Sequence, residues 1–198
     1  MKPVSRRVIT VLCVFLFIAS ASLPCRAWLF DGGSIGSGFS LNNGTNIIWA
    51  AALFVVPSDS YATSFGTALS RMAADTSFDV YLTDSLQDIA GTAIAHWTIA
   101  PTGPVLQYYY VQPENPIFLT GGKAYALAVM PSDTDSYGAV ASSNRGYLGY
   151  LSSDQGANWY QQIVPIAVRV DGTVVPEPCG FILITTGLAL LSRKLRLR

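Results

Sequence analysis

The sequence holds a single histidine, His96, which is the first residue to consider for catalytic chemistry. A lone imidazole can act as a general base, but a nucleophilic triad also needs a hydroxyl or thiol on a strained turn and an orienting acid. The G-x-S-x-G spacing occurs at 32–36, but inside the predicted Gly-rich leader and not on the strand-to-helix turn that the catalytic motif requires. If the segment is a strand, alternation puts His96 on one face with Ile94 and Thr98 and opposite Trp97. We therefore expect a histidine that faces solvent or is hydrogen-bonded at a sheet edge.

Carboxylates could support two other kinds of chemistry. Glycoside hydrolysis uses two carboxyl groups that face each other across a cleft, but the only glutamate between residues 28 and 175 is Glu114, in a proline-flanked predicted turn. Asp133 and Asp135, each beside a serine, form an oxygen-rich loop that could bind calcium, although the spacing lacks the full EF-hand pattern. We expect no enzyme activity and no cofactor, and calcium binding near Asp133 stays an open alternative.

Aromatic residues point to sugar binding as a further possibility. All ten tyrosines and all four tryptophans lie between residues 28 and 175. Aromatic faces on β-sandwiches stack on sugar rings while nearby Asp, Asn and Gln bind the hydroxyls. Tyr109 must face away from Tyr108 and Tyr110 because strand side chains alternate, and the loop-like stretches 143–147 and 158–160 could form a rim. Ordinary core packing is the simpler explanation of these aromatics, and Trp97 is expected to be internal.

Charge and cysteine content exclude several classes of function. The two ends carry eight of the twelve cations and one of the twelve acids, which leaves residues 28–175 with four cations, eleven acids and a net charge of −7. Such an acidic domain is not expected to bind nucleic acid. Cys13, Cys25 and Cys179 all lie near the ends of the chain, so the middle has no disulfide, zinc-thiolate or thiol chemistry.

The middle of the chain consists of short extended runs separated by Gly, Pro, Asn, Asp and Ser, without long helical periodicity, which predicts an all-β domain. The candidate strands are 78–83, 95–99, 105–111, 125–130 and 166–170. A Gly121–Gly122 turn is expected to join 117–119 and 125–130 in a hairpin. This spacing favours a jelly-roll-like antiparallel β-sandwich over residues 46–175, preceded by a flexible Gly-rich leader at 28–45.

The two ends of the chain read as targeting segments. Lys2, Arg6 and Arg7 precede an apolar run over 8–19, and small residues lead to a predicted cleavage site after Ala27, so residues 1–27 form a predicted secretory signal peptide.

The carboxy-terminal segment, 176–198, has three parts: the tripeptide Pro176, Glu177 and Pro178, an apolar run over 179–191, and the cations Arg193, Lys194, Arg196 and Arg198. Thirteen helical residues span only about 20 Å of the roughly 30 Å hydrocarbon layer, so this segment is expected to be a short, marginal transmembrane helix. The positive-inside rule keeps its basic end in the cytoplasm.

This order of tripeptide, apolar helix and basic tail resembles the bacterial PEP-CTERM sorting signal. The resemblance implies recognition in the inner membrane by an exosortase-like transpeptidase that cuts near Pro176, Glu177 and Pro178. The apolar run is short for the family, and Cys179 directly after the tripeptide leaves lipid attachment open as another fate.

The stretches 77–85, 113–129 and 156–160 resemble choice-of-anchor domains, which are β-sandwiches of unassigned activity found ahead of such signals. Together the two resemblances imply an exported, non-catalytic cell-surface or extracellular-matrix protein, associated with exopolysaccharide or biofilm. It would be anchored transiently in the inner membrane and then placed at the surface or outside the cell. The alternative is a carbohydrate-binding module that recognises extracellular polysaccharide.

Overall fold

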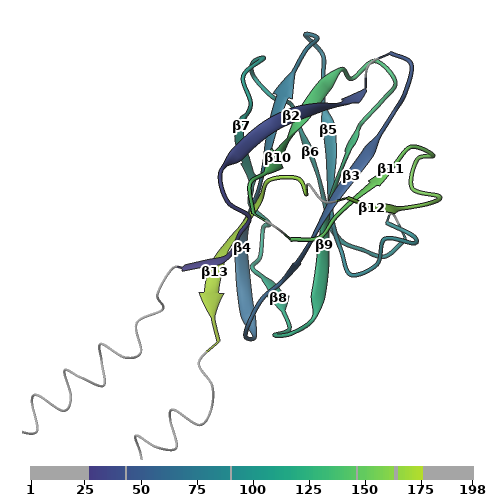
Figure 1. The fold of residues 1–198 in the computed structure, drawn as a ribbon. Helices are drawn as coiled ribbons and strands as arrows, with labels where there is room; N and C mark the ends of the chain where they lie inside the picture. The colour runs from purple at the N-terminus through teal and green to yellow at the C-terminus, as the bar shows by residue number, and fades with distance from the viewer. Residues whose placement is uncertain (1–26, 43, 90, 146, 163–164, 176–198) are drawn as a thin grey trace, which may run out of the picture. The chain divides into compact units, whose positions relative to one another are not determined.

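The structure is a computed structural model and describes residues 27–42, 44–89, 91–145, 147–162 and 165–175 (Figure 1). These residues form thirteen strands and no helix, and all of their strand pairings are antiparallel. Within the same ranges, no helix has the length and hydrophobicity needed to cross a membrane. The signal peptide, apart from Ala27, and the whole 176–198 segment lie outside the described residues.

One sheet has seven strands and is organised around β4, its longest strand. Its members are β1 (Ala27–Asp31), β2 (Ile35–Asn42), β4 (Ser60–Arg71), β7 (Gln107–Val111), β8 (Ile117–Leu119), β10 (Gly138–Ser143) and β13 (Val168–Val174). The main order is β1-β13-β4-β10-β2. Strands β13 and β10 pair with successive parts of one edge of β4, and β8 and β7 pair with successive parts of its other edge. Four strands therefore share β4 as a partner.

The second sheet has six strands in the order β12-β11-β3-β9-β5-β6. Its members are β3 (Trp49–Val55), β5 (Phe78–Thr83), β6 (Ala93–Ile99), β9 (Ala124–Pro131), β11 (Gly149–Ser152) and β12 (Tyr160–Gln162). The predicted all-β fold class with antiparallel sheets is therefore confirmed, and the two sheets form a β-sandwich.

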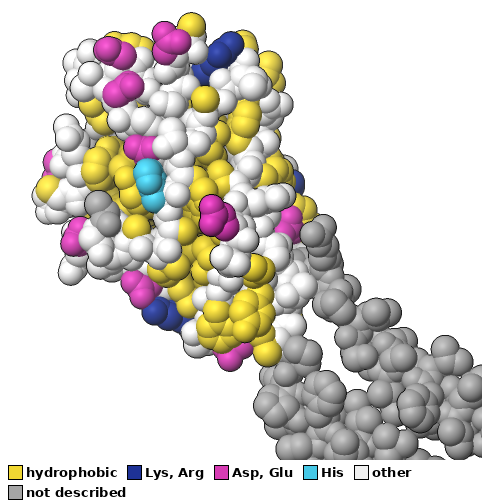
Figure 2. All heavy atoms as spheres, turned by 180° about the vertical axis from the view of Figure 1, so that it is seen from behind, with side chains coloured by type: hydrophobic (Ala, Val, Ile, Leu, Met, Phe, Trp, Pro, Cys, Tyr) yellow, Lys and Arg dark blue, Asp and Glu magenta, His cyan; other side chains and the backbone are white. Residues whose placement is uncertain are grey.

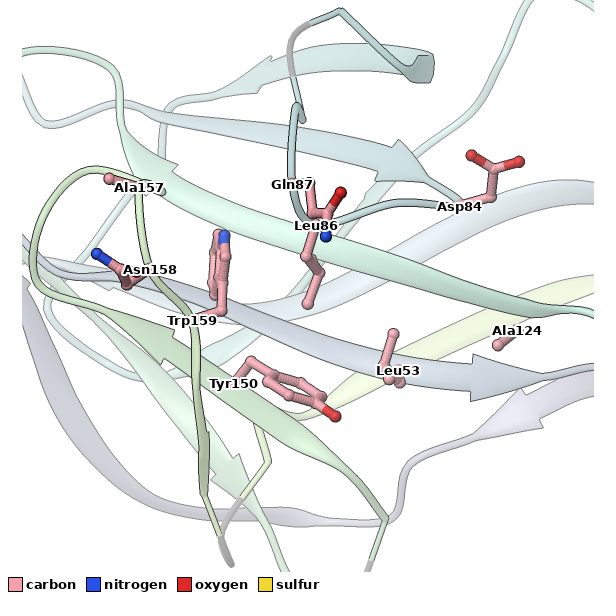
Figure 3. A pocket seen from close by; sticks show the side chains of 9 residues that line it. All are labelled: Leu53, Asp84, Leu86, Gln87, Ala124, Tyr150, Ala157, Asn158 and Trp159. Atoms are coloured by element: carbon pink, nitrogen blue, oxygen red, sulfur yellow. The ribbon is translucent and has the colours of Figure 1, made fainter.

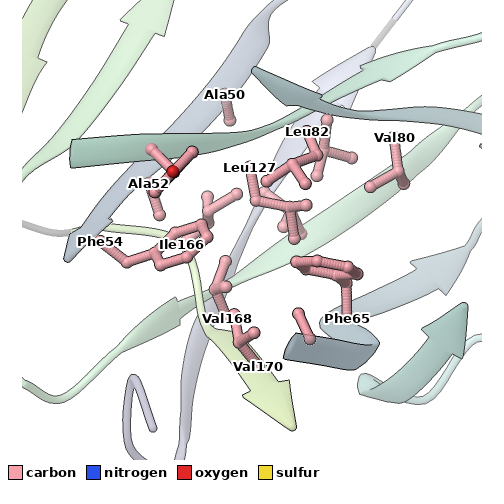
Figure 4. Packing of buried hydrophobic residues seen from close by; sticks show 14 of the residues in the cluster. Ala50, Ala52, Phe54, Phe65, Val80, Leu82, Leu127, Ile166, Val168 and Val170 are labelled. Carbon is pink, nitrogen blue, oxygen red and sulfur yellow. The ribbon is translucent and has the colours of Figure 1, made fainter. Parts of the chain in front are cut away.

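The main hydrophobic core lies between the two sheets, where alternate residues of each strand point inward (Figure 4). Phe54 and Phe78 from the six-stranded sheet and Phe65 from the seven-stranded sheet are its largest fully buried side chains. Burial of each such ring stabilises the fold by roughly 1.5–3 kcal/mol relative to exposure. The inward faces predicted for 78–83 and 95–99 are confirmed, since Phe78, Val80 and Leu82 are buried and Trp97 packs against Phe65 at 5.4 Å.

The prediction of a flexible leader at 28–45 is wrong, because this segment forms β1 and β2 of the seven-stranded sheet. Leu29 and Leu41 are buried in the main core, at 6% and 0% exposure. The glycines that suggested flexibility instead allow neighbouring segments to approach the backbone of β1 and β2 closely. A Cβ on Gly38 would lie 2.6 Å from the Leu106 side chain, and Gly33 adopts a φ of 94° in the turn between the two strands.

The predicted hairpin between 117–119 and 125–130 is also wrong, because the two strands belong to different sheets. Strand β8 pairs with β4, whereas β9 pairs with β3 and β5. Gly122, with a φ of 76°, donates its N–H to the carbonyl of Val56 in a turn that carries the chain across the sandwich. Leu119 is buried beside that crossing, so core packing outweighs the local tendency of a glycine turn to close a hairpin.

The first and last strands of the domain are neighbours. β1 pairs with β13, with Ala27 opposite Gly172, so the domain begins and ends at the same end of the sandwich (Figure 1). Segments joined at residues 27 and 174 therefore start from one place on the domain.

Candidate functional site

The outer face of the six-stranded sheet carries a second hydrophobic cluster. Tyr150, Ala51, Ala128 and Tyr81 are opposed in register across β11, β3, β9 and β5, so two small residues lie between two tyrosines. Because alanine side chains are small, they leave a shallow depression between the two tyrosines, and loops can pack closely there.

Two loops cover this face. The loop after β5 brings Leu86 and Ile89 onto it, and the loop after β11 brings Trp159, so both pack against the buried Ala51 and Ala128.

A hollow of about 650 Å³ opens between these two loops and the sheet (Figure 3). Its apolar lining consists of Leu53, Leu86, Ala124 and Ala157. Its remaining lining consists of two aromatic side chains, Tyr150 and Trp159, and three polar ones, Asp84, Gln87 and Asn158. Both the volume and the mixture of aromatic walls with a few polar groups are typical of small-molecule sites, which are roughly 300–1,000 Å³.

Hydrogen bonds within the loop after β11 hold one wall of the hollow. Asp154 accepts hydrogen bonds from the Asn158 backbone N–H (2.9 Å) and side-chain amide (2.7 Å), and its Oδ1 lies 2.7 Å from the Ser152 hydroxyl. These bonds lower the pKa of Asp154 to about 2. Gly156, with a φ of 89°, brings the backbone onto the ring of Trp49. The loop is thus fixed by its own polar contacts before any ligand binds.

Asp84 and Lys123 form an exposed ion pair with Nζ and Oδ2 2.6 Å apart, on the side of the hollow formed by the loop after β5. The hydrogen bond to Lys123 lowers the pKa of Asp84, and the same bond raises the pKa of Lys123. Asp84 therefore presents an ionised carboxylate, which accepts hydrogen bonds from ligand hydroxyl groups.

Trp159 packs against the second hydrophobic cluster and has one polar atom in its ring. Its indole Nε1 is buried, and no hydrogen-bond partner for it occurs among the described residues. An unsatisfied buried donor costs about 1–3 kcal/mol. The hydroxyl groups of Thr67 and Ser132 are buried without a partner in the same way among the described residues, so this donor by itself assigns no role to Trp159.

His96 is exposed on the edge strand β6, as the sequence predicted. Its Nε2 lies 3.1 Å from Oδ1 of Asp79, and its ring stacks on Tyr81 at 4.3 Å. The Thr98 hydroxyl donates to the same Asp79 oxygen at 2.8 Å. The acid thus contacts both groups, whereas in a nucleophilic triad the imidazole lies between the acid and the hydroxyl.

The loop considered for calcium has a local explanation. Oδ1 of Asp133 accepts a hydrogen bond from the backbone N–H of Asp135 at 3.0 Å, which is a turn contact typical of aspartate. Within the described ranges, no three His, Cys, Asp or Glu side chains gather as a metal-binding group.

The run of three tyrosines alternates as predicted. Tyr109 packs against the main core, while Tyr108 and Tyr110 stack on the outer face of the seven-stranded sheet with centroids 5.9 Å apart. Arg169 lies over the ring of Tyr108 at 4.2 Å and over that of Trp28 at 5.1 Å. In this second aromatic surface, the guanidinium of Arg169 is already paired with Asp31, with Nε and Oδ1 3.2 Å apart.

The two predicted rim stretches have different outcomes. Asn158 and Trp159 line the hollow, but 143–147 does not: Tyr147 packs edge-on against Phe30 at 5.1 Å and donates its hydroxyl to the Ile166 carbonyl. Sequence reasoning missed Tyr150 and the loop after β5. No local signal marks Tyr150, since its place in the hollow depends on the register of β11 against β3.

A comparison of the chain with protein-family models found no match, and a comparison with curated proteins also found none. The sorting residues predicted from the sequence, Pro176, Glu177 and Pro178 with the cations Arg193, Lys194, Arg196 and Arg198, lie outside the described residues.

Proposed function

We propose that this chain is an exported, non-catalytic protein of the cell surface or extracellular matrix, and that its β-sandwich binds extracellular polysaccharide in the Trp159 hollow. The export and sorting parts of this proposal come from the sequence of the two ends. They include processing by an exosortase-like transpeptidase after transient anchoring in the inner membrane. The domain itself is proposed to be of the jelly-roll kind.

The hollow is the observation that supports polysaccharide binding. The rings of Trp159 and Tyr150 offer apolar faces to the faces of a sugar ring, and Asp84, Gln87 and Asn158 offer acceptors and donors to its hydroxyls. A volume of about 650 Å³ has room for part of a polysaccharide chain (Figure 3). The net charge of −7 between residues 28 and 175 favours neutral over acidic polysaccharides.

Affinity electrophoresis of purified residues 28–175 through gels that contain neutral polysaccharides tests this proposal. Trp159→Ala should weaken retardation about tenfold, because ring stacking contributes on the order of 1–2 kcal/mol. Trp28→Ala is the matched control, since Trp28 is a 48% exposed tryptophan on the other sheet. Retardation that is absent with all polysaccharides, or equal loss in both variants, would contradict binding in the hollow.

The proposed sorting is tested separately by the intact mass of the protein recovered from outside the cell. Cleavage near Glu177 predicts the loss of about two dozen carboxy-terminal residues, as the resemblance to the sorting signal implies, together with residues 1–27. Replacement of Glu177 by Ala should leave the uncut form in the membrane fraction. Recovery of the full-length chain in the cytosol would refute both export and sorting.

A further inference from the structure

Four large hydrophobic side chains stand in solvent where the described domain begins and ends. Tyr61 of β4 and Phe118 of β8 are directly opposed, with ring centroids 5.4 Å apart, and are 46% and 48% exposed. Val174, the last residue of β13, is 45% exposed, and Trp28 of β1 is 48% exposed. We call these four residues the terminal patch. Figure 2 shows hydrophobic side chains gathered at one end of the domain.

Strand register places the terminal patch beside both ends of the domain. Tyr61 is opposite Thr173 of β13, and Trp28 is opposite Asp171 on the other side of that strand. Tyr61 and Trp28 therefore flank the strand from which the carboxy-terminal segment leaves the domain, and Phe118 lies one strand further, across β4 from it.

Only four residues, 175–178, separate Val174 from the apolar run that begins at residue 179. Four extended residues span at most about 14 Å, and the prolines at 176 and 178 favour an extended path. The headgroup layer is about 5–8 Å thick on each side of the hydrocarbon. With the apolar run inserted, the end of β13 must therefore lie in or just outside the headgroup layer.

The side chains of the terminal patch suit that location. Tryptophan and tyrosine concentrate at membrane interfaces because their rings are apolar and their N–H or O–H groups remain hydrated. The tether also removes most of the entropic cost of a weak contact, since the domain is already held at the surface. A patch too small to bind a membrane alone can then stay docked.

We propose that the terminal patch packs against the headgroup layer of a lipid bilayer while the 179–191 segment is inserted. This inference rests on the proposed function, because it requires that segment to be the transient anchor. Docking holds the domain upright on the membrane and keeps Pro176, Glu177 and Pro178 in the headgroup layer, within reach of a membrane-embedded transpeptidase. Release by cleavage removes the tether, and the patch then leaves the bilayer.

The test uses the full chain in vesicles of phosphatidylethanolamine and phosphatidylglycerol. In a background with Cys13, Cys25 and Cys179 replaced by Ser, an environment-sensitive fluorophore is attached to Phe118→Cys. The matched control carries it at Val105→Cys, which is 71% exposed at the opposite end of the sandwich, where Gly103 accepts a hydrogen bond from Arg71. Vesicle flotation and quenching by headgroup-labelled nitroxide lipid are then measured.

We expect both proteins to float with the vesicles. Only the label at 118 should shift its emission to shorter wavelength and lose at least about half of its intensity to the quencher. Slowed amide exchange at 60–62 and 117–119 in the unlabelled chain should agree with the label. Flotation with equal, water-like emission from both labels would overturn docking and leave the anchor intact. A chain that fails to float would overturn the anchor and, with it, this inference.

Discussion

Replacing Leu41 by alanine tests whether the segment 28–45 belongs to the folded domain. Leu41 lies in β2, is fully buried and belongs to the main core. Truncation of a fully buried leucine removes its burial energy and leaves a cavity, which together cost about 2–5 kcal/mol. For a domain of this size, each kcal/mol lowers the melting temperature by about 2–4 °C, so Leu41→Ala should lower it by roughly 5–15 °C.

Ile35→Ala is the matched control on the same strand. Ile35 is 36% exposed, so its truncation should cost no more than about 1 kcal/mol. Urea unfolding of residues 28–175, followed by circular dichroism, measures both variants, and the slope of the transition should stay constant because the surface exposed on unfolding is unchanged. If Leu41→Ala were no more costly than Ile35→Ala, β2 would not be packed in the core, and the Gly-rich segment would be a leader after all.

Three further outcomes are expected. The pKa of Asp154 is lowered to about 2, so its hydrogen bonds should support the loop fully above about pH 4 and be lost as the pH falls towards 2. Amide exchange across 153–159 should show this loss, and in Asp154→Ala the protection should be absent already at neutral pH. Burial raises the pKa of Tyr147 to about 12, so its contribution to stability is fully present below pH 10 and declines as the pH rises from 10 to 12. Urea unfolding should show this decline in the parent protein and not in Tyr147→Phe, a variant that should cost about 1 kcal/mol of stability at neutral pH. A Cβ on Gly66 would lie 2.6 Å from the ring of Tyr110, so Gly66→Val should displace that ring and cost about 1–3 kcal/mol in thermal unfolding, and an unchanged melting temperature would show that the ring does not rest on β4.

Several strands that sequence reasoning located correctly have one buried and one wetter face, although β9, predicted at 125–130, is buried on both faces. Phe78, Val80 and Leu82 alternate with more polar residues because only one face of β5 packs into the main core, while Asp79 and Tyr81 on the other face are half-buried. This two-residue period can be seen without knowledge of the partner strands. The same reasoning separated Tyr109 from Tyr108 and Tyr110.

The elements that it missed depend on long-range pairing. β2 and β10 are rich in Gly, Ala and Ser, which fit where neighbouring chains approach closely but resemble linker composition. Half of the hollow was missed for the same reason. Trp159 stands out in any sequence, but only the register between β11 and β3 brings Tyr150 beside Leu53, and only the packing of the loop after β5 brings Leu86 to Trp159.

The pairing of β1 with β13 also governs when the domain can be completed. Among the described strands, the first one along the chain has the last as its partner, and the central β4 needs β13 along much of its length. The pairings of β13 with β1 and with β4 can form only after about 145 further residues of chain have followed Ala27. Under the proposed export, a chain threaded from its amino terminus would lack both β13 pairings until its final strand emerged, so the seven-stranded sheet would be completed only on the far side.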